Sequence, residues 1–365
     1  MTHLILHIGP PKCGSSSIQH FLKSEWKGHY RHVSPPLIDL MDQNVVSDDS
    51  NLAEFISEVN EMLKKKNFAI LSHEYFFECH RAVKFICDQV KADRISIIGY
   101  VRPSSKLLVA AFNQWEFRNP EMSDSINEIL KSNLLEPNLF LGTEAYLMAI
   151  VLDSQKLTLK PYKWSEEFLK LESLISHDHV ELIVNSLPSK NRSFDLIEDF
   201  CDKSGLAKGS YSPDVINPAF SEIIVESFYR TSKEFKNRLG QHGYNHFLRK
   251  VSAEMNEVHL TTSSLFQKLC AYIDGETHSE TISFSRRYNI PEEELLPDNR
   301  TEKDAVLKLI KEENNLRQSQ SSLLVAYQNM SSEWAVRSFD DFVANSKKKS
   351  SKSGISKLLT IFKKK

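Results

Sequence analysis

The chain has 365 residues, which is enough to bury a sizeable core in one large or two small domains. A hydrophobic content of 41% and a charged content of 26% are typical of a soluble globular protein, and the net charge of -2 argues against a general nucleic-acid binder. The 5 cysteines are scattered and include no C-x-x-C pair, which argues against a disulfide framework or a zinc site and favours a reducing compartment.

The beginning of the chain carries none of the marks of a targeting segment. It lacks the basic flank of a signal peptide and enters an apolar run at once. No apolar run in the chain approaches the roughly 20 residues that a membrane-spanning helix needs. We therefore expect neither a secretory leader nor a membrane span.

The first predicted element is a strand over 4–8, where an apolar run rich in β-formers indicates burial on both faces. The next segment reads Gly9-Pro-Pro-Lys-Cys-Gly-Ser-Ser-Ser17, and apolar residues recur at helical spacing from Ile18 onward. A helix is therefore predicted to begin within the serines, which are good N-cap residues. Strand, turn and helix N-terminus together form an anion site, because amide groups and the helix dipole point at the ligand and Lys12 adds a full charge.

The position of the lysine distinguishes two kinds of phosphate loop. The nucleotide triphosphatase loop reads G-x-x-x-x-G-K-[ST], but here Ser15 follows Gly14 in place of that lysine. The segment His7-Ile-Gly-Pro-Pro-Lys-Cys-Gly-Ser-Ser-Ser-Ile-Gln19 instead resembles the 5′-phosphosulfate loop of bacterial sulfotransferases, which reads close to H-I-G-x-x-K-T-G-[ST]-[ST]-S-I-Q. It departs from that pattern at Cys13, where the family usually has threonine. The alternative is an ordinary strand-to-helix turn of another α/β protein.

Strands and helices alternate along the following part of the chain. Helices are predicted over 52–66, 79–91, 105–117, 138–152, 166–174 and 193–204, and strands over 68–71, 95–101, 157–162 and 180–184. Ser193 is the predicted cap of the last of these helices, and Gly205 closes it. The alternation predicts an α/β fold with a central parallel sheet flanked by helices, in which ligands bind beyond the carboxyl ends of the strands. The resemblance implies the P-loop nucleotide-binding, sulfotransferase-like version of this fold.

Arg102 directly follows the predicted strand over 95–101. The resemblance implies that this arginine and a serine eight residues later bind the 3′-phosphate of the nucleotide, a task that suits a planar guanidinium. Position 110 is alanine, so Ser104 or Ser105 substitutes, or the helix register differs, or the 3′-phosphate is held more weakly. The alternative for Arg102 is a surface ion pair.

A second polar segment, Ser72-His73-Glu74, follows the predicted strand over 68–71. Related bacterial sequences carry a similar triplet, in which the glutamate takes the proton from the acceptor hydroxyl. An alcohol becomes a better nucleophile as it loses its proton, so a base is needed near the phosphosulfate. Glu74 is the first candidate for that base and His73, which titrates near neutrality, is the second. The alternative for both residues is a structural or merely solvated position.

The C-terminal third is predicted to be rich in helix. We expect a sulfotransferase-like domain over 1–297, with a nucleotide-binding core over 1–185 and an α-rich acceptor-side region over 186–297, followed by a charged helical extension over 298–345. The tail over 346–365 contains eight lysines and no acidic residue, and its apolar residues fall on one helical stripe. Such a basic amphipathic helix suits an anionic membrane surface, and the alternative is a disordered solubilising tail.

The resemblance covers residues 1 to about 220 and implies a sulfotransferase whose donor is 3′-phosphoadenosine 5′-phosphosulfate, with no metal. Lys12 stabilises charge on the bridging oxygen and Glu74 or His73 accepts the proton. The nucleotide contacts fall on Gly9, Pro10, Pro11, Lys12, Cys13, Gly14, Ser15, Ser16, Ser17, Arg102 and Ser105. By analogy we expect the acceptor to be a hydroxyl of a surface glycan or glycolipid. We also expect a bacterial, cytoplasmic enzyme, which would be peripheral at the inner face of the membrane if the tail binds there. The rivals are an ATP-dependent kinase of similar fold and an inactive scaffold.

Overall fold

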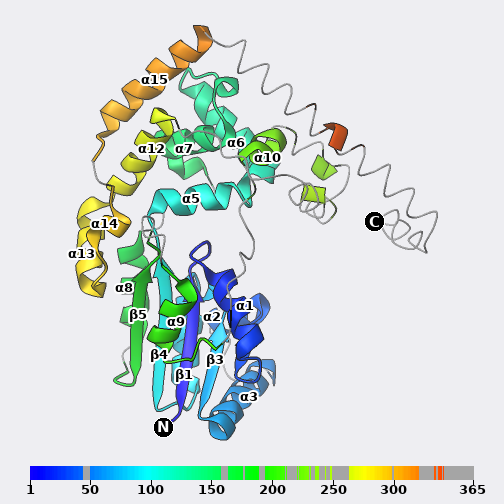
Figure 1. Cartoon of the computed structure of the whole chain (residues 1–365), viewed down its shortest axis with the longest axis vertical. Coiled ribbons are helices and arrows are strands. Elements are labelled where there is room, and N and C mark those ends of the chain that lie inside the picture. Colours follow the sequence, from blue (N-terminus) through cyan, green and yellow to red (C-terminus); the bar gives the residue numbers. More distant parts are fainter. Residues whose placement is uncertain are drawn as a thin grey trace, which may run out of the picture. The chain divides into compact units, whose positions relative to one another are not determined.

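A computed structural model of the chain divides into two compact units, and its ribbon is drawn in Figure 1. Unit 1 comprises Met1–Leu107, Pro161–Pro218 and Ala271–Arg300, and unit 2 comprises Leu108–Lys160, Ala219–Cys270 and Thr301–Lys365. The residues that the structure describes are 1–43, 50–157, 163–175, 177–188, 194–209, 211, 220, 222–229, 263–297, 300–319 and shorter pieces within 231–248 and 333–340. The predicted basic tail over 346–365 lies outside them.

Unit 1 is built on a parallel sheet. Its described residues form five strands in the order β2-β3-β1-β4-β5. The strands are β1 (His3–Gly9), β2 (Tyr30–His32), β3 (Phe68–Ser72), β4 (Arg94–Val101) and β5 (Val180–Ser186). β1 and β4 are buried along almost their whole length, as their apolar runs predict for strands covered on both faces. The predicted α/β fold with a central parallel sheet is therefore confirmed.

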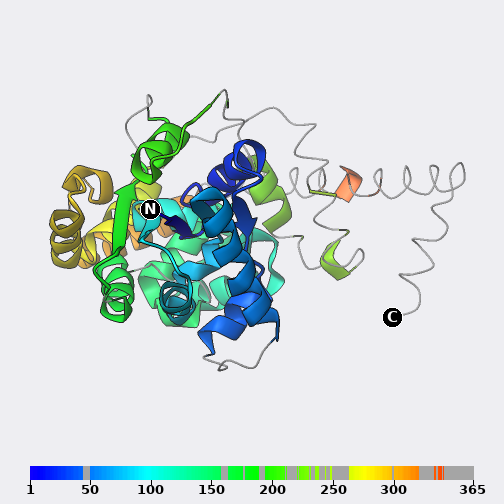
Figure 2. The ribbon, with the colours of Figure 1, turned by 90° about the horizontal axis from the view of Figure 1, so that it is seen from below.

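The helices of unit 1 cover both faces of this sheet. They are α1 (Ser15–Glu25), α2 (Pro35–Asp42), α3 (Ser50–Lys66), α4 (His80–Gln89), α8 (Trp164–Leu174), α9 (Leu196–Ser204), α13 (His278–Tyr288) and α14 (Glu292–Leu295). Helix α1 contacts α9, whereas α4 contacts α2 and α8. Figure 1 shows α1 and α9 in front of the strands, and Figure 2 shows the same sheet from below with α8 on the opposite side. The chain runs from β1 toward one edge of the sheet and from β4 toward the other, and parallel strands connected by the usual right-handed crossovers then have helices on both faces.

Several predicted boundaries differ from the observed ones. The helix predicted over 193–204 begins at Leu196, and its N-cap is Asp195, whose carboxylate accepts from the amides of Ile197 and Glu198. The predicted cap Ser193 was therefore wrong, although Gly205 closes the helix in the left-handed conformation as expected. The strand predicted over 157–162 lies outside the described residues except for Leu157.

Strand β2 and helix α2 of unit 1 are among the elements that were not predicted from the sequence. Strand β2 has three residues, two of them exposed, and so offers no apolar run to recognise. Helix α2 begins with Pro35 after an extended Ser34, the position at which proline is tolerated because the missing amide has no partner in the helix.

The described residues of unit 2 are helical. They contain η2 (Glu116–Arg118), α6 (Pro120–Ser132), η3 (Pro137–Leu139), α7 (Gly142–Asp153), η4 (Ser154–Lys156), α10 (Glu222–Tyr229) and α15 (Lys303–Ser319). Helices α5 (Ser104–Phe112) and α12 (Ser264–Gly275) contribute residues to both units. In the core of unit 2, Phe112 stacks on Tyr146 with ring centroids 4.8 Å apart. The helix predicted over 105–117 is shorter than expected, because α5 ends at Phe112 and η2 follows.

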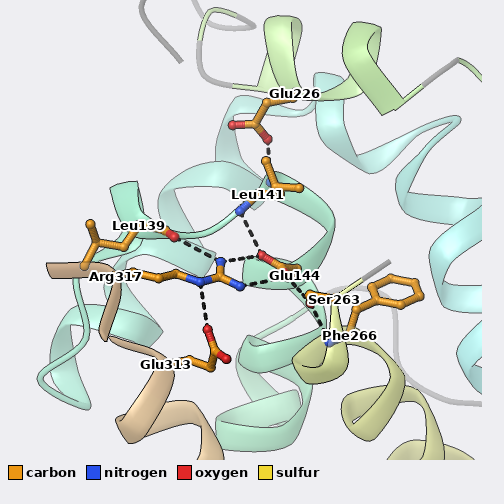
Figure 3. Close-up of polar contacts among 9 residues, drawn as sticks. Leu139, Leu141, Glu144, Glu226, Ser263, Phe266, Glu313 and Arg317 are labelled. Atoms are coloured by element: carbon orange, nitrogen blue, oxygen red, sulfur yellow. Dashed lines mark hydrogen bonds and ion pairs between the residues drawn. The ribbon is translucent and has the colours of Figure 1, made fainter. Parts of the chain in front are cut away.

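A buried ion pair ties α15 to α7 within unit 2 (Figure 3). The guanidinium of Arg317 donates to both carboxylate oxygens of Glu144, at 2.7 and 3.2 Å, and also to Glu313 and to the Leu139 carbonyl. The side chain of Glu144 is only 5% exposed, and its carboxylate also accepts from the Leu141 amide at the start of α7. One carboxylate therefore caps α7 and binds α15 at the same time.

Two further findings concern the chain as a whole. All five cysteines are free thiols, and four of them are buried. Within the described part of the chain, no helix is both long enough and apolar enough to cross a membrane.

Candidate functional site

The loop from Gly9 to Ser17 lies at the carboxyl end of the central strand. β1 pairs with β3 on one side and β4 on the other. From β1 the chain runs toward the β2 edge, whereas from β4 it runs toward β5, so the switch point of the sheet lies between β1 and β4. Ligands of open α/β sheets bind in the crevice at such a point. The sequence motif and the topology therefore select the same place in unit 1.

Three residues of the loop have a left-handed backbone. They are Gly9, Lys12 and Gly14, with φ of 89°, 62° and 83°. Gly9 also lets two segments approach closely, because a Cβ there would lie 2.8 Å from the Cα of Glu74. A lysine in this conformation is sparsely populated and costs about 1 kcal/mol or more, which proteins tolerate mostly at functional sites.

Helix α1 begins at Ser15, within the serines as predicted, but the cap is not a serine. Gly14 is the N-cap, in the left-handed conformation, and it offers no side chain to the first amides of the helix. The hydroxyl of Ser15 donates to the Pro10 carbonyl at 3.0 Å, and the residue is only 2% exposed. The side chain of Ser15 therefore holds the loop together, while Ser16 and Ser17 are partly exposed on the first turn.

Gly14 should tolerate a side chain poorly. A Cβ at this position would lie 2.3 Å from Cδ2 of Leu196 in α9, so Gly14→Ala meets both a clash and a strained φ. We expect it to lower the free energy of unfolding by about 2–4 kcal/mol, measured by urea denaturation. Gly205→Ala is the matched control, because it has the same strained φ with nothing within 4 Å, and should cost about 1 kcal/mol. Equal losses in the two variants would contradict the packing of α9 on the loop.

The side chain of Cys13 belongs to the hydrophobic core of unit 1. It is fully buried, and burial raises the pKa of the thiol to about 12, so the residue is an inert part of the core. The departure from the sulfotransferase pattern at this position therefore changes the interior of the loop. Only the backbone of Cys13 is available to a bound group. Pro10 is buried as well, whereas Pro11 is partly exposed.

Arg102 lies against the loop. Its Nη1 donates to the Lys12 carbonyl at 3.0 Å, and its own carbonyl accepts from the indole of Trp164 at 3.0 Å. Burial lowers the pKa of the guanidinium, while Cys13 and Asp274 act in the opposite direction. Arg102 is thus a partly buried cation fixed beside Lys12, and the structure brings together two groups that are ninety residues apart in the chain.

His73 and Glu74 follow β3 and face different environments. Nδ1 of His73 accepts from the Tyr75 amide at 2.9 Å, so the imidazole caps η1 (Glu74–Phe77). Burial and the neighbouring His32 lower the pKa of His73 to about 4, which leaves it neutral at pH 7. Burial raises the pKa of Glu74, whereas Lys12 partly opposes that shift. Glu74 is therefore the carboxylate that interacts with the loop lysine.

The hydroxyl of Ser105 has a partner that the sequence does not reveal. It donates to Oδ2 of Asp274 at 2.6 Å, and the Ser105 amide donates to Oδ1 at 2.7 Å. Burial raises the pKa of Asp274 to about 6, against the two hydrogen bonds and the charges of Lys106 and Arg102. Asp274 is 169 residues further along the chain, so no local pattern could have identified it. Ala110 lies on the same helix, α5.

Comparisons with known proteins give little direct information. No protein-family model matches the chain, and no curated protein matches it either. Among solved structures, a sulfotransferase from Alicyclobacillus acidocaldarius is similar, with 11% sequence identity and a TM-score of 0.32. The match covers 64% of this chain and 94% of that one. Within the described residues, no group of three or more metal-ligating side chains is present.

Proposed function

We propose that this protein is a sulfotransferase that uses 3′-phosphoadenosine 5′-phosphosulfate as donor and a hydroxyl group as acceptor. The observation that carries the proposal is the convergence of Lys12, Arg102 and Glu74 at the switch point of one parallel sheet. Two cations beside a helix N-terminus suit a polyanionic nucleotide, and a carboxylate next to them supplies a base. The loop motif, which resembles that of bacterial sulfotransferases, supports the same assignment.

The residues of the loop fit a phosphate group. Gly14 leaves the first amides of α1 without a capping side chain over them, so those amides, with the hydroxyls of Ser16 and Ser17, would hold the 5′-phosphate. Arg102 is anchored to the Lys12 carbonyl and would hold the 3′-phosphate with the rest of its guanidinium fork. When bound, 3′-phosphoadenosine 5′-phosphosulfate would supply the sulfuryl group that is transferred, and its 5′-phosphate would be the leaving group.

The base in this proposal is Glu74. Its carboxylate takes the proton of the acceptor hydroxyl, and the ionised fraction that can do so grows as pH rises through its raised pKa. Lys12 lies where its charge interacts with Glu74 and with the loop, so it neutralises negative charge on the leaving side. The cap formed by His73 holds the start of η1, and with it the backbone of Glu74. His73 is accordingly a positioning residue.

For the acceptor we propose a carbohydrate hydroxyl of a surface glycan or glycolipid. The basis is the resemblance of the loop to the bacterial enzymes, together with the basic amphipathic pattern over 346–365, which suits an anionic membrane surface. The enzyme would then work in the cytoplasm at the inner face of the membrane. Binding of the purified protein to vesicles with and without anionic lipid tests the membrane part separately.

Calorimetric titration in EDTA tests the donor site. We expect adenosine 3′,5′-bisphosphate to bind more tightly than adenosine 5′-monophosphate, and Arg102→Ala to lose about tenfold of that preference, because the 3′-phosphate is the part of the nucleotide to which the guanidinium would bond. Arg94→Ala, at the opposite end of β4 in an exposed pair with Glu181, is the matched control and should leave both affinities unchanged. Binding of ATP only with magnesium would indicate a kinase, and the absence of any nucleotide binding would indicate a scaffold.

A further inference from the structure

Asp274 occupies the N-terminus of α5 as an anion would. Pro103 precedes this helix and has no side-chain acceptor, although its carbonyl accepts from the Leu107 amide. The carboxylate of Asp274 takes the place of a capping side chain and accepts from both the amide and the hydroxyl of Ser105, at 2.7 and 2.6 Å. These two donors are of the kind that a phosphate oxygen would use.

The charges around this carboxylate are those of an anion-binding position. Arg102, at the end of β4, and Lys106, on α5, both act on Asp274 electrostatically in favour of its ionised form. Arg102 also donates to the Lys12 carbonyl of the loop, so the same guanidinium that bonds to the loop acts on the Asp274 carboxylate through its charge. Burial nevertheless raises the pKa of Asp274 to about 6, because desolvation disfavours the ionised carboxylate more than these charges and the Ser105 hydrogen bonds favour it. A phosphate placed beside Arg102 would be repelled by the ionised Asp274 carboxylate, which already accepts from the amide and the hydroxyl of Ser105.

We propose that Asp274 is a specificity-determining residue, an internal anion that occupies the donors of Ser105 and repels the 3′-phosphate of a nucleotide bound beside Arg102. This inference rests on the proposed function, in which Arg102 binds that phosphate. Asp274 weakens the binding of nucleotides that carry a 3′-phosphate, and has little effect on those with a 3′-hydroxyl. The proposal also changes the expected role of Ser105. Its hydroxyl can donate to a phosphate only after its hydrogen bond to Asp274 has broken.

The variant Asp274→Asn separates this role from simple capping of α5. The asparagine oxygen can accept from the Ser105 amide, and its NH₂ group can donate to the Ser105 hydroxyl, so the cap is kept and only the charge is removed. We expect its affinity for adenosine 3′,5′-bisphosphate to rise about tenfold over wild type in EDTA, and that for adenosine 5′-monophosphate to change less than about twofold. Glu276→Gln, an exposed acid two residues along the chain, is the control for a general change of charge.

Inorganic phosphate, followed by thermal unfolding, is the second probe. If nucleotides bind but Asp274→Asn leaves the ratio of the two affinities unchanged, the inference is overturned and the proposed function stands. If no nucleotide binds, yet phosphate stabilises Asp274→Asn more than wild type, the competing anion position stands and the proposed donor falls. If phosphate also has no selective effect, both are overturned.

Discussion

Replacing Lys12 with alanine is expected to weaken the binding of adenosine 3′,5′-bisphosphate by about a hundredfold, the largest effect on binding that we predict. Lys12 provides a full positive charge inside a loop whose backbone it also shapes, with φ of 62°. It lies beside Arg102 and interacts with Glu74, in a partly buried place where charge is weakly screened. Calorimetric titration in EDTA at constant ionic strength measures the change.

The matched control for Lys12 is Lys23, which is exposed two turns further along α1. Lys23→Ala removes the same charge from the helix that follows the loop and should change the affinity by less than about twofold, because an exposed charge at that distance is screened by salt. Equal losses in the two variants would mean that the loop attracts the nucleotide only through overall charge. An unchanged affinity in Lys12→Ala would remove the loop from the donor site.

Replacing Glu144 with alanine is expected to destabilise unit 2 by about 3–5 kcal/mol, the largest stability effect that we predict. The change leaves Arg317, only 19% exposed, without its main counter-ion and removes the acceptor for the Leu141 amide. Amide hydrogen exchange with peptide resolution measures the effect, and protection should fall in α7 and α15. Peptides of β1 and β4, in unit 1, report whether the loss spreads.

The control for Glu144 lies on the same helix as Arg317. Glu312 forms an exposed i, i+4 pair with Lys308 in α15, so Glu312→Ala should change the stability by less than about 0.5 kcal/mol. The double variant Glu144→Gln with Arg317→Met removes both charges and should be more stable than Glu144→Ala alone, because no buried guanidinium is left uncompensated. If Glu144→Ala exchanged like wild type in α15, the ion pair in Figure 3 would not hold that helix.

The sequence predicts the sheet of this protein well, because its central strands are continuous apolar runs. Phe68–Ser72 and Arg94–Val101 are recognisable for this reason, and alternation with helices then implies parallel pairing. Strand β2 could not be predicted, because three residues at the edge of a sheet need no apolar run. Its place in the sheet is set only by pairing with β3. Short edge strands are defined by their neighbours, so they leave no pattern of their own.

The candidate site, like the sheet, could be predicted from the sequence only where a local pattern marks it. The loop around Lys12, the Ser72–Glu74 segment and Arg102 could be proposed as candidates because each follows a strand, and carboxyl ends of parallel strands meet at one edge. Contacts between distant segments were missed. Nothing in the sequence around Ser105 indicates that Asp274 binds it, and nothing around Gly14 indicates that Leu196 of α9 lies close to it. These pairs of residues are distant in the sequence and come together only when the chain has folded.

The order in which unit 1 is assembled matters during synthesis on the ribosome. Its central strand is the first element to be made, but its last segment, Ala271–Arg300, follows only after most of the chain has been translated. That segment carries α13, which packs on α8 through Phe284 and Phe168, with ring centroids 5.6 Å apart. The side of α8 that α13 covers therefore lacks this partner until Ala271–Arg300 has been made.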